Sequence, residues 1–196
     1  SWYSFRMRIL PAVLVFACAL AISLGISLGA AGSASASTGV QYGIQDDAWL
    51  EFGPGSLSSR VAKLDRMGFD AVRVTLSWHE IETSPGRYRW GRSDRLLGAL
   101  NARGLRPVVT LWGTPRWANR GENPNVAPPD GLEYHFQNFT RTIASRYPYV
   151  DAWTMWNEPN KPLWLKPASP RTYVQQILNP GYRGIKAANP NAAVAG

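Results

Sequence analysis

The sequence predicts an α/β fold in which parallel strands alternate with helices. Three apolar runs, at 70–76, 106–112 and 150–156, are separated by segments with helical spacing. Near-continuous apolar strands are typical of a parallel sheet covered on both faces. The longest loops follow these runs and do not precede them. This favours a (β/α) barrel, because the loops after barrel strands build the active site.

Two helices are expected in the first half of the chain, after a first strand at 40–45. One is capped by Ser56 and ends near Gly68, and the other is capped by Ser93 and ends near Gly104. Their apolar stripes are Leu57, Val61 and Leu64 in the first helix, and Leu96, Leu97 and Leu100 in the second.

The second half continues the alternation after a long loop at 113–129. Asp130 and Glu133 resemble a capping box, and an apolar stripe follows at helical spacing. A further helical stretch begins at Ser169 and is disturbed at Pro180, and a short fifth strand covers 192–195. The residues of the apolar stripe are Leu132, Phe136, Phe139 and Ile143.

A complete (β/α)8 TIM barrel has eight strands and about 250 residues. The expected fold is therefore a TIM barrel truncated after about five β/α units, with three strands beyond Gly196. A doubly wound sheet is the alternative architecture. It is disfavoured because no glycine-rich nucleotide fingerprint follows the first strand.

The N-terminal residues 1–36 are expected to be a signal peptide or a membrane anchor. Arg6 and Arg8 precede an uncharged stretch at 9–32, and Ala34-Ser35-Ala36 resembles a signal-peptidase site. Cleavage would leave residues 37–196 as a secreted, extracellular domain without cysteine. The apolar stretch approaches the roughly 20 residues that span a bilayer, so a membrane-anchored, extracytoplasmic protein is the alternative.

Composition argues against several other functions. The net charge is +8, but the 21 basic residues are scattered without a block, which disfavours a nucleic-acid partner. The two histidines, His79 and His135, have no ligand neighbours at metal-binding spacing, and no G-x-S-x-G elbow of a serine hydrolase is present. The sequence therefore predicts no metal and no cofactor, and a monomer.

The chemistry centres on Trp156-Asn157-Glu158-Pro159, which follows the strand at 150–156. Glycoside hydrolysis needs a carboxylic acid that protonates the leaving-group oxygen, and a second carboxylate across the anomeric carbon. Glu158 fits the first role. Tryptophan neighbours and the charge of a second carboxylate would both raise its pKa, so that it keeps a proton near neutral pH.

With these flanks, the chain resembles a clan A glycoside hydrolase, the retaining (β/α)8 families that include family 5 cellulases and family 39 xylosidases. The resemblance covers roughly residues 40–196 and is carried by WTMWNEPN at 153–160, VRVTLSWHEIE at 72–82, GRYRW at 86–90 and TLWGTPRWA at 110–118. It implies that Glu158 is the acid/base and that Asn157 contacts the sugar 2-hydroxyl. It also implies that Arg73 lies under a nucleophile from strand seven, a position that Glu80, Glu82 and Glu122 do not match.

Several aromatic residues at strand ends are candidates for stacking on sugar rings, although each could equally be core packing. They are Trp78, His79, Trp112, Trp117 and Trp164, whereas Trp49, Trp90 and Trp153 are assigned to packing. The resulting hypothesis is a secreted retaining β-glycosidase that acts on a polysaccharide or oligosaccharide. The 196 residues alone are expected to be inactive without the nucleophile. The alternative is a noncatalytic carbohydrate-binding barrel at the cell surface.

Overall fold

The computed structural model describes residues 39–196, so the predicted signal peptide or anchor at 1–36 lies outside the described part. Residues 41–196 form one compact unit. None of the helices within residues 39–196 has the length and apolar character needed to cross a membrane.

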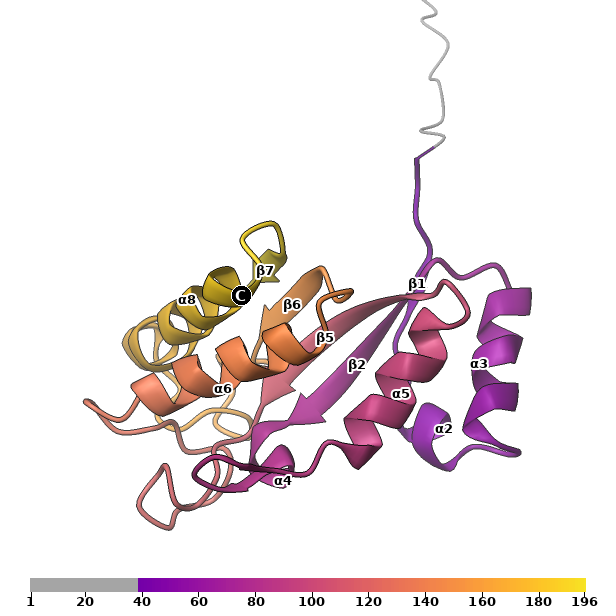
Figure 1. Ribbon diagram of the computed structural model, residues 1–196. Helices are drawn as coiled ribbons and strands as arrows, with labels where there is room; N and C mark the ends of the chain where they lie inside the picture. The colour runs from indigo at the N-terminus through magenta and orange to yellow at the C-terminus, as the bar shows by residue number, and fades with distance from the viewer. Residues whose placement is uncertain (1–38) are drawn as a thin grey trace, which may run out of the picture. The chain divides into compact units, whose positions relative to one another are not determined.

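The main sheet has five parallel strands in the order β1-β2-β5-β6-β7 (Figure 1). Their bounds are β1 Gly43–Ile44, β2 Ala71–Ser77, β5 Arg106–Trp112, β6 Ala152–Met155 and β7 Ala193–Ala195. Each strand lies beside the one that precedes it in this sheet, with no reversal of direction along the order. The predicted parallel α/β sheet is confirmed, and the doubly wound alternative is wrong for the described strands, because that fold requires a switch point. The closed eight-stranded barrel stays a prediction.

Helices cover one side of this sheet in Figure 1. The longer ones are α3 Leu57–Arg66, α5 Gly91–Asn101, α6 Tyr134–Arg146 and α8 Asn179–Ala188. In β2, fully buried Val72, Val74 and Leu76 alternate with half-buried residues that include Arg73 and Thr75. Because side chains alternate between the faces of a strand, one face of β2 lies in the core and the other carries polar groups.

The predicted helix caps were right in two cases. The Ser56 hydroxyl accepts a hydrogen bond from the Ser59 amide at 3.2 Å, at the start of α3. The Ser169 hydroxyl accepts from the Thr172 amide at 3.1 Å, at the start of α7 Pro170–Thr172. In both places a serine in extended backbone precedes the first helical turn, which is the usual N-cap geometry.

Two other predicted caps were wrong because a distant residue takes the side chain. Helix α5 begins before Ser93, whose hydroxyl instead accepts from the Tyr147 hydroxyl at 2.9 Å. Asp130 does not cap α6; its carboxylate accepts from the Gln176 amide at 2.7 Å.

The disturbance predicted at Pro180 is a π-helical segment, η1 Tyr173–Leu178, that leads into α8. Two glycines of α8, Gly181 and Gly184, lie against β6 and α6, where an added Cβ would approach Met155 and Thr140 closely. Sequence analysis missed four short elements: α2 Asp47–Phe52, α4 Trp78–Ile81 and the hairpin β3 Glu82–Ser84 with β4 Arg87–Tyr88.

Candidate active site

The candidate site lies where β2, β5 and β6 end. Strands β5 and β6 pair in register from Val108↔Ala152 to Leu111↔Met155. The pairing continues past the end of β6, because the Trp156 amide donates to the Leu111 carbonyl at 2.8 Å. Asn157 and Glu158 are thereby placed beside the end of β5.

The backbone of the motif is unusual on both sides of Asn157. Trp156 has φ 74° and Glu158 has φ 38°, in the left-handed region that non-glycine residues rarely enter. Such conformations cost about 1–3 kcal/mol each and concentrate at functional sites. Trp156 is held by burial to 1% exposure and by its indole N–H, which donates to the Trp164 carbonyl at 2.6 Å. Trp156 therefore anchors the motif in the core, and Asn157 and Glu158 lie outside the core.

Arg73 reaches Asn157 from the middle of β2. Its guanidinium donates to the Thr110 hydroxyl at 2.8 Å, to the Gln45 amide oxygen at 2.7 Å and, at a long 3.5 Å, to the Asn157 amide oxygen. All three acceptors are neutral. The resemblance places Arg73 under a nucleophile carboxylate from strand seven, and its partners among the described residues are hydroxyl and amide oxygens. Because the Asn157 oxygen faces Arg73, its NH₂ group is free to point elsewhere.

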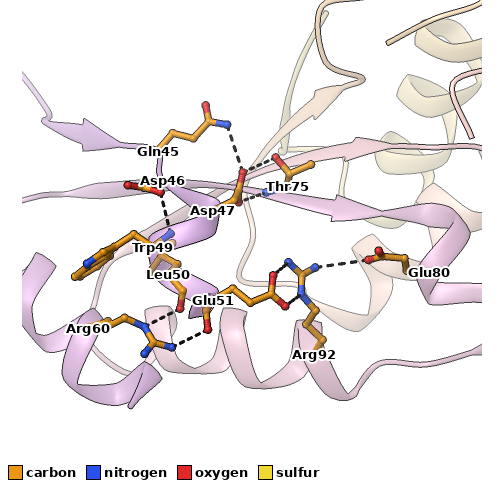
Figure 2. Close-up of polar contacts among 10 residues, drawn as sticks. All are labelled: Gln45, Asp46, Asp47, Trp49, Leu50, Glu51, Arg60, Thr75, Glu80 and Arg92. Atoms are coloured by element: carbon orange, nitrogen blue, oxygen red, sulfur yellow. Dashed lines mark hydrogen bonds and ion pairs between the residues drawn. The ribbon is translucent and has the colours of Figure 1, made fainter. Parts of the chain in front are cut away.

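Residues of the first loop hold this arrangement at the sheet edge (Figure 2). Strand β1 ends at Ile44, and the Asp47 carboxylate then takes the Thr75 amide and hydroxyl, both at 2.8 Å. Asp47 therefore accepts hydrogen bonds from β2 at the point where β1 has already ended. The Gln45 amide nitrogen also lies 3.5 Å from Asp47, so the residue that contacts Arg73 is tied to the same loop.

Helix α2 is fixed to its neighbours by two arginines, also shown in Figure 2. Arg60 is buried and donates to the carbonyls of Leu50 at 2.9 Å and Glu51 at 3.2 Å, and further to those of Gly53 and Gly55. Arg92 forms a two-pronged ion pair with the Glu51 carboxylate at 2.6 and 2.7 Å.

Glu158 differs from the expectation in its protonation. Its side chain is 44% exposed, and its carboxylate accepts from the Lys161 ammonium at 2.6 Å. This hydrogen bond and the charge of Lys161 lower the pKa of Glu158 below its ordinary value. The expectation of a raised pKa was wrong for this structure, because the hydrogen bond and charge of Lys161 outweigh the raising effect of desolvation on the pKa of Glu158.

Three of the predicted aromatic residues lie together. The Trp112 ring contacts the His79 ring at 5.6 Å and the Trp164 ring at 5.2 Å, edge to face in both cases. Burial lowers the pKa of His79, whose Nδ1 has no hydrogen-bond partner among the described residues. Gly113, at φ 83°, makes room for this imidazole, since a Cβ there would lie 2.5 Å from Nδ1.

Trp78 and Trp117 do not join this cluster. Trp78 is 0% exposed, packs on Phe136 and Phe139, and donates to the Glu82 carboxylate at 2.7 Å. Trp78 is thus a core residue, and its assignment to substrate binding was wrong. Trp117 is half-buried against Trp78, and its indole N–H donates to the Glu82 carbonyl at 3.0 Å.

Sequence analysis also missed polar residues that shape the site. Lys161 follows Glu158 by three residues, but both lie in a loop, where the i,i+3 pairing rule for helices does not apply. Gln45 and Thr110 contact Arg73 across 28 and 37 residues of sequence, and local pattern does not indicate such contacts. Within residues 39–196, no three His, Cys, Asp or Glu side chains are grouped closely enough to hold a metal ion.

Comparison with solved structures supports a glycosidase fold. A family 39 glycoside hydrolase from Bacteroides cellulosilyticus WH2 is similar at TM-score 0.63 and 19% identity, over 79% of this chain and 30% of that chain. The exo-β-1,4-mannosidase Op5Man5 from Opitutaceae bacterium strain TAV5 is similar at TM-score 0.63 and 20% identity, over 79% and 31%. The endoglucanase Cel5A from Thermotoga maritima follows at TM-score 0.57 and 18% identity, over 79% and 50%.

The fold is that of these glycoside hydrolases. The resemblance expected from the sequence is thereby confirmed at the level of the fold. The chain spans 30–50% of the length of these neighbours. No protein-family model matches the sequence.

Proposed function

We propose that the chain carries the acid/base half of a secreted retaining β-glycosidase that acts on polysaccharides or oligosaccharides. The observation that carries the proposal is Asn157-Glu158 at the carboxyl end of β6, with Arg73 on Asn157, in a glycosidase fold. Glu158 would protonate the leaving-group oxygen and then, as a carboxylate, activate the water that releases the sugar. Asn157 would hydrogen-bond the sugar 2-hydroxyl through the amide group that Arg73 leaves free.

The acid role requires Glu158 to hold a proton, which Lys161 opposes. A substrate that entered beside Glu158 would displace the exposed Lys161 ammonium or separate it from the carboxylate. A nearby nucleophile carboxylate would raise the pKa of Glu158 further, since two adjacent carboxylates resist double ionisation. We propose that this nucleophile comes from a strand beyond the five described, so that the closed (β/α)8 barrel is completed by additional chain.

The proposal is tested by hydrolysis of 4-nitrophenyl β-glucoside, β-xyloside and β-mannoside. We expect turnover by the complete natural protein that contains these residues, and none by the 196 residues alone. If the 196 residues alone hydrolysed a substrate and still did so after substitution of Glu158, two assignments would be contradicted: Glu158 as the acid/base, and a nucleophile from a further strand.

The ion pair between Glu158 and Lys161 favours a second candidate, a noncatalytic carbohydrate-binding barrel at the cell surface. A paired, exposed carboxylate is an ordinary surface feature and is poorly suited to donate a proton. This candidate predicts that the complete natural protein binds oligosaccharides without cleaving them. Product analysis after prolonged incubation with an oligosaccharide distinguishes the two functions.

A further inference from the structure

A small cavity between α2 and α3 has only cations among its charged side chains. Its volume is about 150 Å³. Neither Glu158 nor Asn157 lines it, so the chemistry proposed above does not use this cavity. The lining residues are Trp49, Pro54, Ser59, Arg60, Lys63 and Arg66.

Arg60 brings a buried positive charge to the cavity wall. Its residue is 7% exposed, and its guanidinium donates only to backbone carbonyls. A guanidinium has five N–H groups, so four such bonds leave one N–H group without an acceptor within residues 39–196. No carboxylate of this part of the chain pairs with Arg60 either. The four carbonyls are those of Leu50 and Glu51, both drawn in Figure 2, and of Gly53 and Gly55.

Lys63 and Arg66 add two exposed cations to the same wall. The Lys63 ammonium lies 5.8 Å from the centroid of the Trp49 ring, and the Arg66 side chain has no hydrogen bond or ion pair to another described residue. The intervening Asp65 carboxylate pairs with Arg103 of α5, at 3.6 Å. Cations in the last turn of a helix are favourable in any case, but that effect does not extend to Arg60 in the first half of α3.

The wall opposite α3 is in place before any ligand arrives. The Gly53 amide donates to the Trp49 carbonyl at 2.9 Å, and the bonds from Arg60 tie the turn at 53–55 to α3. A Cβ at Gly53 would lie 2.9 Å from the Trp49 ring and 3.1 Å from the Arg60 side chain. The turn, the indole and the guanidinium are therefore in close contact, and a ligand does not have to order them.

The charge and size of the cavity suit a single phosphate group. A phosphate monoester carries about −1.5 to −2 charges at neutral pH, which matches three cations better than the single charge of a carboxylate. Arginine and lysine are the side chains that bind phosphate most often. The volume is below the roughly 300–1,000 Å³ of pockets that enclose a whole small molecule. The rest of the ligand would therefore stay outside, beside the flat apolar surface of Trp49.

We propose that this cavity binds the phosphate group of a phosphate monoester. The spare N–H group of Arg60 and the charges of Lys63 and Arg66 hold the phosphate oxygens, and the group that carries the phosphate rests on the Trp49 indole. The site is separate from the proposed glycosidase chemistry and does not depend on it.

The test is an NMR titration of the full 196-residue chain, labelled with nitrogen-15, at constant ionic strength. The probes are glycerol phosphate, inorganic phosphate and acetate. The indole N–H signal of Trp49, identified by its loss in Trp49→Phe, reports on the cavity. We expect a saturable shift of this signal with both phosphates, tighter binding of the ester than of the free ion, and at least about tenfold weaker binding of acetate.

A pair of double variants separates a built site from general attraction to a basic protein. Lys63→Gln with Arg66→Gln should raise the Kd of glycerol phosphate at least about tenfold. Arg87→Gln with Arg116→Gln removes the same charge from two exposed positions elsewhere and should change the Kd less than twofold. All four positions are exposed, so both variants are expected to fold, which circular dichroism checks.

Three results would overturn the proposal. They are the lack of a saturable shift with either phosphate, acetate binding as tight as phosphate binding, and equal weakening in the two double variants. Binding of inorganic phosphate as tight as that of the ester would keep the phosphate site but identify the free ion as its ligand.

Discussion

Alanine substitutions at two helix glycines, Gly184 in α8 and Gly98 in α5, are predicted to have opposite effects on the stability of the domain. At Gly184 an added Cβ would lie 2.0 Å from the Thr140 hydroxyl, 2.3 Å from the Gln137 carbonyl and 3.0 Å from the Arg141 amide. The last two are backbone atoms of α6, so relief requires a shift of the whole helix. At Gly98 in α5 the same atom would meet nothing within 4 Å.

The free energies follow from these distances. Alanine gains about 1 kcal/mol over glycine in a helix interior. Overpacking costs about 1–3 kcal/mol, and the two backbone contacts at Gly184 place it at the upper end. Gly184→Ala should therefore destabilise the domain by about 2 kcal/mol net, and Gly98→Ala should stabilise it by up to about 1 kcal/mol.

Thermal unfolding followed by circular dichroism measures both effects. For a domain of this size about 1 kcal/mol corresponds to about 2–4 °C, so Gly184→Ala should lower the Tm by about 4–8 °C and Gly98→Ala should raise it by about 2–4 °C. If Gly184→Ala raised the Tm as Gly98→Ala does, the close approach of α8 to α6 would be refuted.

Two further predictions concern charged side chains. Arg60→Met removes a buried guanidinium that serves four carbonyls around α2. Arg60→Met should lower the free energy of unfolding in urea by about 3 kcal/mol. The control, Arg66→Met at an exposed position, should change it by less than about 0.5 kcal/mol. Equal effects of the two substitutions would contradict the role of Arg60 in holding α2 in place. Lys161→Met removes the cation that holds the pKa of Glu158 low, so that pKa should rise toward its ordinary value in a carbon-13 NMR titration. The alkaline limb of any activity that needs protonated Glu158 should then move to higher pH, and an unchanged titration would exclude Lys161 as the cause.

The strands were predictable because their apolar runs are long and bounded. Strand β5 was found at its observed bounds, 106–112, and β2 within one residue at each end. Strand β1 was overextended, mostly on its N-terminal side, since it was predicted at 40–45 and covers Gly43–Ile44, and α2 Asp47–Phe52 was missed. The Asp46-Asp47 pair was the available signal, since Asp46 caps α2 by accepting from the Trp49 amide at 2.9 Å.

Within the site, alternation along a strand accounts for only part of the division between core residues and half-exposed candidates. Val72, Val74 and Leu76 are buried at alternate positions of β2, whereas Trp78 lies in α4 beyond the strand and is buried by its packing on Phe136 and Phe139. Trp112 has the opposite parity to buried Leu111 and remains half-exposed. The sequence could not show the pairing of Glu158 with Lys161, since the left-handed backbone at Glu158 directs the side chain and depends on tertiary anchoring of Trp156.

The central claim is that Glu158 is the acid/base of a retaining β-glycosidase. Its most direct test is the kcat of Glu158→Gln in the complete natural protein on an oligosaccharide with a poor leaving group, with exposed Glu122→Gln as control. Loss of a general acid/base predicts a fall of about 10²–10⁴-fold in kcat for Glu158→Gln, with Glu122→Gln unchanged. The account would be contradicted by equal activity of the two variants, or by a wild-type protein that binds the oligosaccharide and never cleaves it.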